Sequence, residues 1–198
     1  PVSNQLMVYL TGSGGTPVNF VLPASVGVSS VTFTGNLPGS VLGAASITTA
    51  QFTQLANLTA NHLTFSTTYP ISLYLTPSDL TNIAAINGAL YQSAGIHMVV
   101  VGSSPINLTT ALAIHDQGFG FAIPKLLSDH SLSYADYQTL VRDNAASVPL
   151  NAVLPDGATL KDTSLSVGVL KGLVASSTLN LSTMKVSDAL ISISDALT

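Results

Sequence analysis

Short apolar runs alternate with helix-like segments along most of the chain. Residues 131–153 show this most clearly, because an apolar run, a segment with helical spacing and a second apolar run follow one another. Ser133 and Asp136 stand at the start of the helical segment with the spacing of a capping box. The pattern predicts a strand, a capped helix and a second strand. The inward face of the helix is expected to carry Tyr137, Leu140 and Val141.

The same order of elements is expected from residue 46 onwards. Residues 48–51 predict a helix start, with Phe52, Leu55 and Leu58 inward and a strand at 62–66. A strand at 71–75 precedes the strongest helix start. In it, Thr76 is the N-cap, Pro77 the first helical residue and Asp79 the acidic residue at the third helical position. This helix is predicted to continue to Gly95, with Leu80, Ile83, Ala84 and Leu90 at helical spacing.

The remaining units are less regular. The sequence predicts a buried strand at 96–101, a degenerate unit at 106–114, a helix that follows residues 159–162 and carries Leu165, Val169, Leu170 and Leu173, a strand at 177–181, and a last helix start at 184–190. Residues 1–45 differ, because three β-type runs at 6–10, 18–22 and 28–34 are separated by glycine-rich segments. We therefore predict a β-rich N-terminal section over 1–45 and a strand–helix region over 46–198.

Equivalent helix-start positions recur at a nearly constant spacing. The step from Gln51 to Asp79 is about 28 residues, which is a typical length for a structural repeat. The steps from Asp79 to Asp136 and from Asp136 to Asp188 are each roughly twice as long. A single strand–helix unit cannot bury its apolar face alone, so the units must stack. The sequence thus predicts an α/β repeat, a solenoid-like stack of strand–helix–strand units whose open ends must be capped or paired with another chain.

Charge is scarce and lies mostly on aspartate. Only 7% of the residues are charged against about 25% in an average domain. All nine acidic residues are Asp, and the net charge of −4 excludes a nucleic-acid binder that depends on clustered Lys and Arg. Such a surface has little long-range repulsion between copies, so we expect it to tolerate close self-packing; a simply neutral, soluble protein is the alternative.

Three further features of the sequence limit its chemistry and bear on membrane insertion and processing. The chain has no Cys, so disulfides, thiolate chemistry and Cys-based zinc sites are not expected. No apolar run approaches the roughly 20 residues of a membrane span. The chain opens on Pro1 without a leader sequence, so we expect it to be processed or cut from something longer.

One loop gathers candidate ligand-binding residues. His115 and Asp116 precede it, Phe119 and Phe121 lie within it, and Asp129 and His130 follow it. The four polar side chains could meet around a metal or a polar ligand, or the aspartates could be turn residues beside surface histidines. His97 lies in an apolar run, which favours a satisfied core or interface histidine. Exposed aromatic rings for a sugar are expected at Tyr69, Tyr91, Phe119 and Phe121.

Catalytic constellations are sparse. No Gly-x-Ser-x-Gly elbow occurs. A glycoside hydrolase needs two carboxylates at a set separation, but five aspartates stand where helix starts favour Asp. These are Asp79, Asp136, Asp162, Asp188 and Asp195.

The helix starts at residues 132–137 and 75–80 have the form Leu-Ser/Thr-x-Ala/Ser-Asp followed by an apolar residue, and residues 186–190, Val-Ser-Asp-Ala-Leu, are a looser copy. In this the chain resembles the tandem repeats of very large secreted bacterial surface proteins, the adhesin-like and S-layer-like proteins exported by type I systems. The likeness covers roughly residues 46–198. It implies an extracellular or cell-surface location. The glycine- and aspartate-rich calcium nonapeptides of many such proteins are absent here, so no cofactor is expected, and calcium stays open as an alternative without a supporting motif.

These observations predict a non-enzymatic extracellular structural protein, a segment of a surface layer, fibre or adhesin. Its expected partner is itself, in a homo-oligomer, filament or lattice, with glycans as a further possibility and neither nucleic acid nor a membrane span. The alternatives are a carbohydrate-binding module that uses residues 116–130 and an Asp-based glycoside hydrolase built on Asp116 and Asp129.

Overall fold

The fold is described from a computed structural model. It describes residues 5–9, 30–34, 46–58, 63–65, 71–161, 164–174, 179–182 and 185–186. Some predictions lie outside these residues: the strand at 18–22, the ring of Tyr69, the helix beyond residue 186, and the helix-start roles of Asp162, Asp188 and Asp195.

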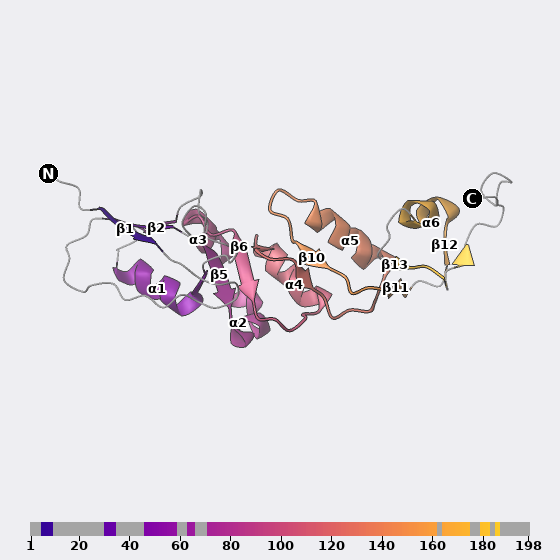
Figure 1. Ribbon diagram of the computed structural model, residues 1–198, viewed down its shortest axis with the longest axis horizontal. Coiled ribbons are helices and arrows are strands. Elements are labelled where there is room, and N and C mark those ends of the chain that lie inside the picture. The colour runs from indigo at the N-terminus through magenta and orange to yellow at the C-terminus, as the bar shows by residue number, and fades with distance from the viewer. Residues whose placement is uncertain are drawn as a thin grey trace.

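Helices and short parallel strands follow one another along the long axis of the molecule in the order of the chain (Figure 1). The strands are β1 (Gln5–Tyr9), β2 (Ser30–Thr34), β3 (Ser46–Thr48), β4 (Leu63–Phe65), β5 (Ser72–Leu75), β6 (Met98–Val101), β7 (Gly120–Phe121), β8 (Lys125–Leu126), β9 (Ser131–Leu132), β10 (Ala152–Val153), β11 (Ala158–Leu160), β12 (Ser164–Leu165), β13 (Leu179–Asn180) and β14 (Lys185–Val186). The helices are α1 (Thr49–Leu58), α2 (Pro77–Thr81), the 3-10 turn η1 (Ile83–Ala85), α3 (Gly88–Ser93), α4 (Leu108–Asp116), α5 (Tyr134–Asn144) and α6 (Val167–Val174).

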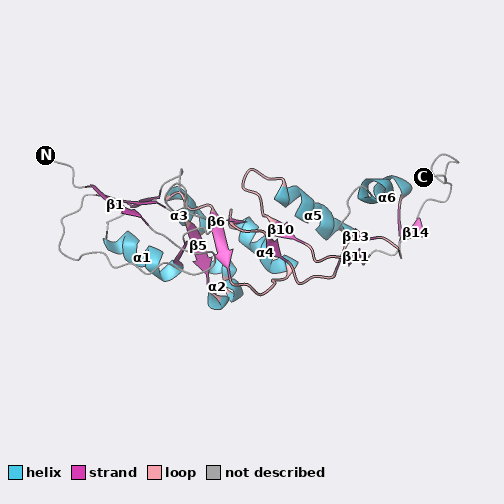
Figure 2. Ribbon diagram, in the orientation of Figure 1, coloured by secondary structure: helices cyan, strands magenta, loops and turns pink. Residues whose placement is uncertain are grey.

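The fold mixes helices and strands (Figure 2), and every described strand pair is parallel. The largest sheet has the order β3-β5-β6-β7, and the others are β1-β2-β4, β10-β8, β13-β11-β9 and β12-β14. Paired residues lie at a similar distance along the chain, as Ser46 with Ser72 and Lys125 with Ala152 illustrate. Each parallel pair therefore needs a crossover connection, which in most cases contains a helix.

The predicted strands at 6–10, 28–34, 62–66, 71–75, 96–101 and 177–181 correspond to β1, β2, β4, β5, β6 and β13, with bounds that differ by at most two residues. β1 and β2 pair in one sheet with β4. Strand pairing therefore joins the sections predicted as 1–45 and 46–198.

One hydrophobic core continues from β3 to α6. Ile47, Leu73, Val99 and Phe121 are aligned across four neighbouring strands, and each side chain is at most 1% exposed. The same cluster extends to Leu173 on α6. Phe52 belongs to it, and Leu80, Tyr137 and Leu165 pack against it, as expected of a continuous apolar spine.

The two capping boxes are confirmed. The hydroxyl of Thr76 accepts from the backbone N–H of Asp79, whose carboxylate accepts in return from the Thr76 N–H at 2.8 Å. Ser133 and Asp136 form the same arrangement at the start of α5. The unit at 106–114, which departs from the repeated pattern in sequence, contains α4, a regular helix whose N-cap Asn107 accepts from the Thr110 N–H.

Two predicted helices are corrected. The helix expected from Pro77 to Gly95 is divided into α2, η1 and α3, because the chain leaves helical geometry at Asn82 and again at Ile86. As a result Ala84 and Leu90 are exposed. The helix expected after residues 159–162 is α6, which begins at Val167, so Leu165 lies in β12 ahead of the helix and is not a helical residue.

Val141 was expected on the inward face of α5, but its side chain is 49% exposed. The buried residues of α5 are Leu140 and Asp143, so a carboxylate takes a position on the inward face.

Among the described residues, no helix combines the length and the apolar character that crossing a bilayer requires.

Candidate functional site

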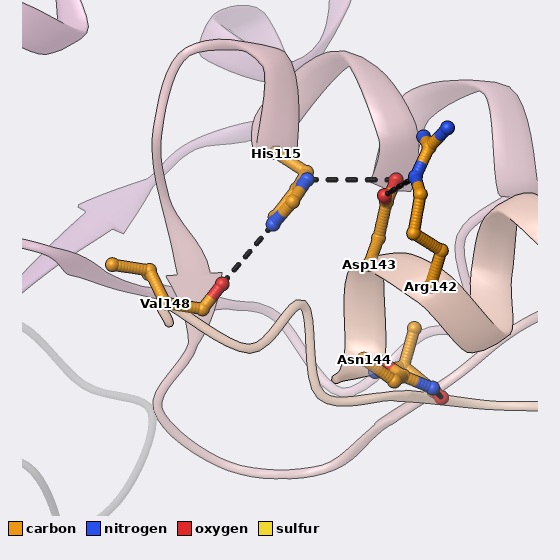
Figure 3. Close-up of polar contacts among 6 residues, drawn as sticks. His115, Arg142, Asp143, Asn144 and Val148 are labelled. Carbon is orange, nitrogen blue, oxygen red and sulfur yellow. Dashed lines mark hydrogen bonds and ion pairs between the residues drawn. The ribbon is translucent and has the colours of Figure 1, made fainter. Parts of the chain in front are cut away.

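A group of polar contacts among His115, Arg142, Asp143 and Val148 joins α4 to α5. His115 Nδ1 lies 3.5 Å from Asp143 Oδ2, and its other ring nitrogen, Nε2, lies 3.1 Å from the carbonyl oxygen of Val148 (Figure 3). The second oxygen of Asp143 accepts from Arg142 Nε at 2.8 Å. The Asp143 side chain is 8% exposed, whereas that of Arg142 is 73% exposed. The buried carboxylate of α5 thus joins His115 of α4 to an exposed guanidinium, and His115 in turn contacts the loop at Val148.

The ring of His115 is held by acceptors at both ends. A carbonyl oxygen can only accept, so Nε2 must carry the proton that points to Val148. A general base needs a free ring nitrogen that faces the substrate, and here Nε2 is taken up by the backbone. The hydrogen bond to Asp143 raises the pKa of the Arg142 guanidinium and keeps it charged. The arrangement therefore fixes the 148–150 loop against α4 rather than presenting a reactive nitrogen.

Asp143 was missed in the sequence, where His115 was grouped with the neighbouring Asp116. The structure exposes Asp116 and brings Asp143, from the next helix, to the histidine instead. One signal could have found it: Asp143 stands at helical spacing from Leu140 and so falls on the buried face of the helix. A carboxylate on a buried face needs a partner.

The other predicted ligand residues do not converge. Asp129 Oδ2 accepts from the backbone N–H of Leu108 at 2.6 Å and so caps α4. His130 is exposed, and its carbonyl oxygen accepts from Thr159. In the part of the chain that the structure describes, no three His or Asp side chains gather as a metal site would require.

The aromatic residues predicted to be exposed are buried. Phe119 is 0% exposed, Phe121 1% and Tyr91 7%. The three form part of the core, and the rings of Tyr91 and Phe52 lie 4.4 Å apart between centroids. None of the three can stack on a sugar in this state. His97 directly precedes β6 and is exposed, so it is not a core histidine, and the alternative of an interface histidine stays a prediction.

Several polar side chains form hydrogen bonds to segments that are distant in the sequence. The number of residues between the two partners is similar in each case. Thr49 Oγ1 donates to Asp79 Oδ1, 30 residues away, and Gln92 Nε2 donates to the Gln117 carbonyl, 25 residues away. Asn151 Nδ2 donates to the Phe121 carbonyl over 30 residues. The separations are similar to those of the paired strands, so side chains and backbone join the same neighbouring segments.

A basic side chain is buried near the end of β6. Lys125 is 7% exposed, and its ammonium donates to the carbonyl oxygens of Gly102 and Ser104, the latter at 2.7 Å. Desolvation lowers the pKa of this ammonium. Lys125 lines a groove on the surface of the sheet together with Tyr74, Ile123 and Leu126.

Replacing Tyr91 with phenylalanine is expected to make the fold less sensitive to alkaline pH. Burial raises the pKa of the Tyr91 hydroxyl above 10.0, and the charge of Asp79 raises it further. The folded state then holds this proton more tightly than the unfolded state, so its contribution to stability is complete below about pH 10 and is lost as the pH rises through the folded pKa. Melting curves between about pH 9 and about pH 11 test this. The wild-type melting temperature should fall more than that of Y91F, and parallel curves would contradict the assignment.

No family model matches the chain, and neither a curated protein nor a solved structure matches it.

Proposed function

We propose that this chain is a non-enzymatic, extracellular structural protein whose strand–helix units wind as an α/β solenoid and assemble with further copies. The observation that carries the proposal is the similar separation of all paired segments along the chain. The separation is short for Ser164 with Lys185 and longer for Val31 with Leu63, yet every pair stays within the usual range of one structural repeat. A chain whose contacts all join neighbouring turns grows in one direction and is open at its ends.

The polar contacts support a structural role. Asp79, Asp129 and Asp136 each accept from a backbone N–H at a helix start. Asp143 joins two helices. A carboxylate that accepts a hydrogen bond from a helix start, or that contacts a largely buried histidine, has a structural role. This favours a scaffold over a hydrolase built on aspartates.

The surface supports self-assembly. Few charges keep copies apart, since only 7% of the residues are Lys, Arg, Asp or Glu. Several large apolar side chains are also exposed, with Leu90 at 50% and Val153 at 44%. A carbohydrate-binding module is the weaker candidate, because Tyr91, Phe119 and Phe121, which were proposed to stack on sugars, are buried.

Sizing with light scattering over a concentration series, followed by negative-stain electron microscopy, tests the assembly. We expect the apparent mass to rise with concentration above the 20.3 kDa of one chain, with filaments or sheets in the micrographs. The series is repeated with a chelator and with added calcium. A strict monomer under all ion conditions would remove the self-assembly part of the proposal. Antibody labelling of intact cells tests the surface location separately.

A further inference from the structure

The groove beside Lys125 exists because the parallel sheet divides at this point. β7 pairs with β6, and the Ala122 N–H still donates to the Val99 carbonyl. The chain then turns away, because β8 pairs with β10 instead and the Lys125 N–H donates to Asn151. The end of β6 and the start of β8 therefore diverge. The opening between them has a volume of about 540 Å³, which lies within the range of small-molecule sites.

The Lys125 side chain lines this opening. It brings its ammonium to the carbonyl oxygens of Gly102 and Ser104, just beyond the end of β6. An ammonium has three donors, and these two bonds use two of them. Carbonyl oxygens stabilise the ammonium but carry no net charge. The ion pairs among the described residues are those of Asp143 with His115 and Arg142, so Lys125 has no carboxylate partner in that part of the chain.

The walls of the groove are apolar. Tyr74 and Val100 lie next to each other across β5 and β6, on the face opposite the core ladder of Leu73 and Val99. Ile123 and Leu126 complete the wall, and each is 47% exposed. The exposed Val153 is the register partner of Leu126 and continues the apolar surface beyond the groove. A cation thus stands at the edge of an apolar surface that the described chain leaves uncovered.

We propose that this groove binds an amphiphilic monocarboxylate, such as a medium-chain fatty acid. Its carboxylate pairs with the Lys125 ammonium, and its hydrocarbon chain covers Ile123 and Leu126. The buried positive charge selects the anionic head group, since an ion pair in a partly dry site is worth more than one in water. The exposed apolar wall selects the tail, because the tail removes that surface from water. This activity is separate from the proposed structural function.

Isothermal titration with octanoate tests the proposal, with octanol and acetate as matched probes that lack the charge and the tail. We expect octanoate to bind at least tenfold more tightly than either probe. Replacing Leu126 with aspartate removes part of the apolar wall and adds a negative charge to the lining of the groove, so L126D should lose at least tenfold in octanoate affinity. The control is L90D, which makes the same change at a leucine of similar exposure on α3.

Equal affinities for octanoate and octanol would overturn the role of Lys125. Equal octanoate affinities of L126D and the wild type would overturn the site itself. K125M is a direct second variant wherever circular dichroism shows that it folds, and it should bind octanol and octanoate equally. A third outcome is that the protein does not bind octanoate but associates as its concentration rises, and that L126D abolishes this association. The groove would then be a contact with a second copy of the chain, and the proposal would be overturned.

Discussion

Replacing Gly120 with alanine is expected to lower the free energy of unfolding by about 3 kcal/mol or more. A Cβ at this position would lie 2.0 Å from the carbonyl oxygen of Pro149, which is a backbone atom and cannot rotate away. β7 and residues 149–150 would have to separate. The hydrogen bond from the Phe121 N–H to the Leu150 carbonyl, at 3.0 Å, would be lost with them. Urea denaturation followed by circular dichroism measures the change.

Gly102 provides the matched control. A Cβ there would meet no other atom within 4 Å, so G102A should unfold within about 0.5 kcal/mol of the wild type. If G120A and G102A had the same midpoint, the close approach of β7 to the 149–150 loop would not exist in solution. The attachment of that loop matters for the polar site as well, because Val148 holds the ring of His115.

The second large effect is expected for Phe121→Ala. The ring is 1% exposed and lies in register with Val99 in the core ladder, so its removal should cost about 3 to 5 kcal/mol through lost burial and the cavity left behind. A loss of this size would confirm Phe121 as a core residue. Thermal and urea unfolding both measure it.

Leu90→Ala is the comparison for a side chain outside the core. Leu90 is 50% exposed on α3, and alanine favours helix, so a change of less than about 1 kcal/mol is expected. If F121A were as stable as L90A, the assignment of Phe121 to the core would be wrong. A role for its ring in ligand contact would then have to be reconsidered.

Local features of this protein were determined by the sequence alone. Thr76 with Asp79, and Ser133 with Asp136, cap their helices through bonds within a single turn, and such bonds need only the backbone geometry of that turn. The positions of most strands followed in the same way from short apolar runs. The break at Asn82 was missed because apolar residues continued at helical spacing on either side of it.

Only the tertiary structure decided which distant residues meet. It placed Asp143 rather than Asp116 beside His115, and it buried Phe119 and Phe121, which the sequence predicted to lie in an exposed loop. It also divided the sheet so that Lys125 lines a groove. These outcomes depend on the register between neighbouring segments, and a slip of one position in that register would turn each strand side chain to the opposite face. The order of residues within one segment does not contain this register, because it arises when neighbouring segments pack.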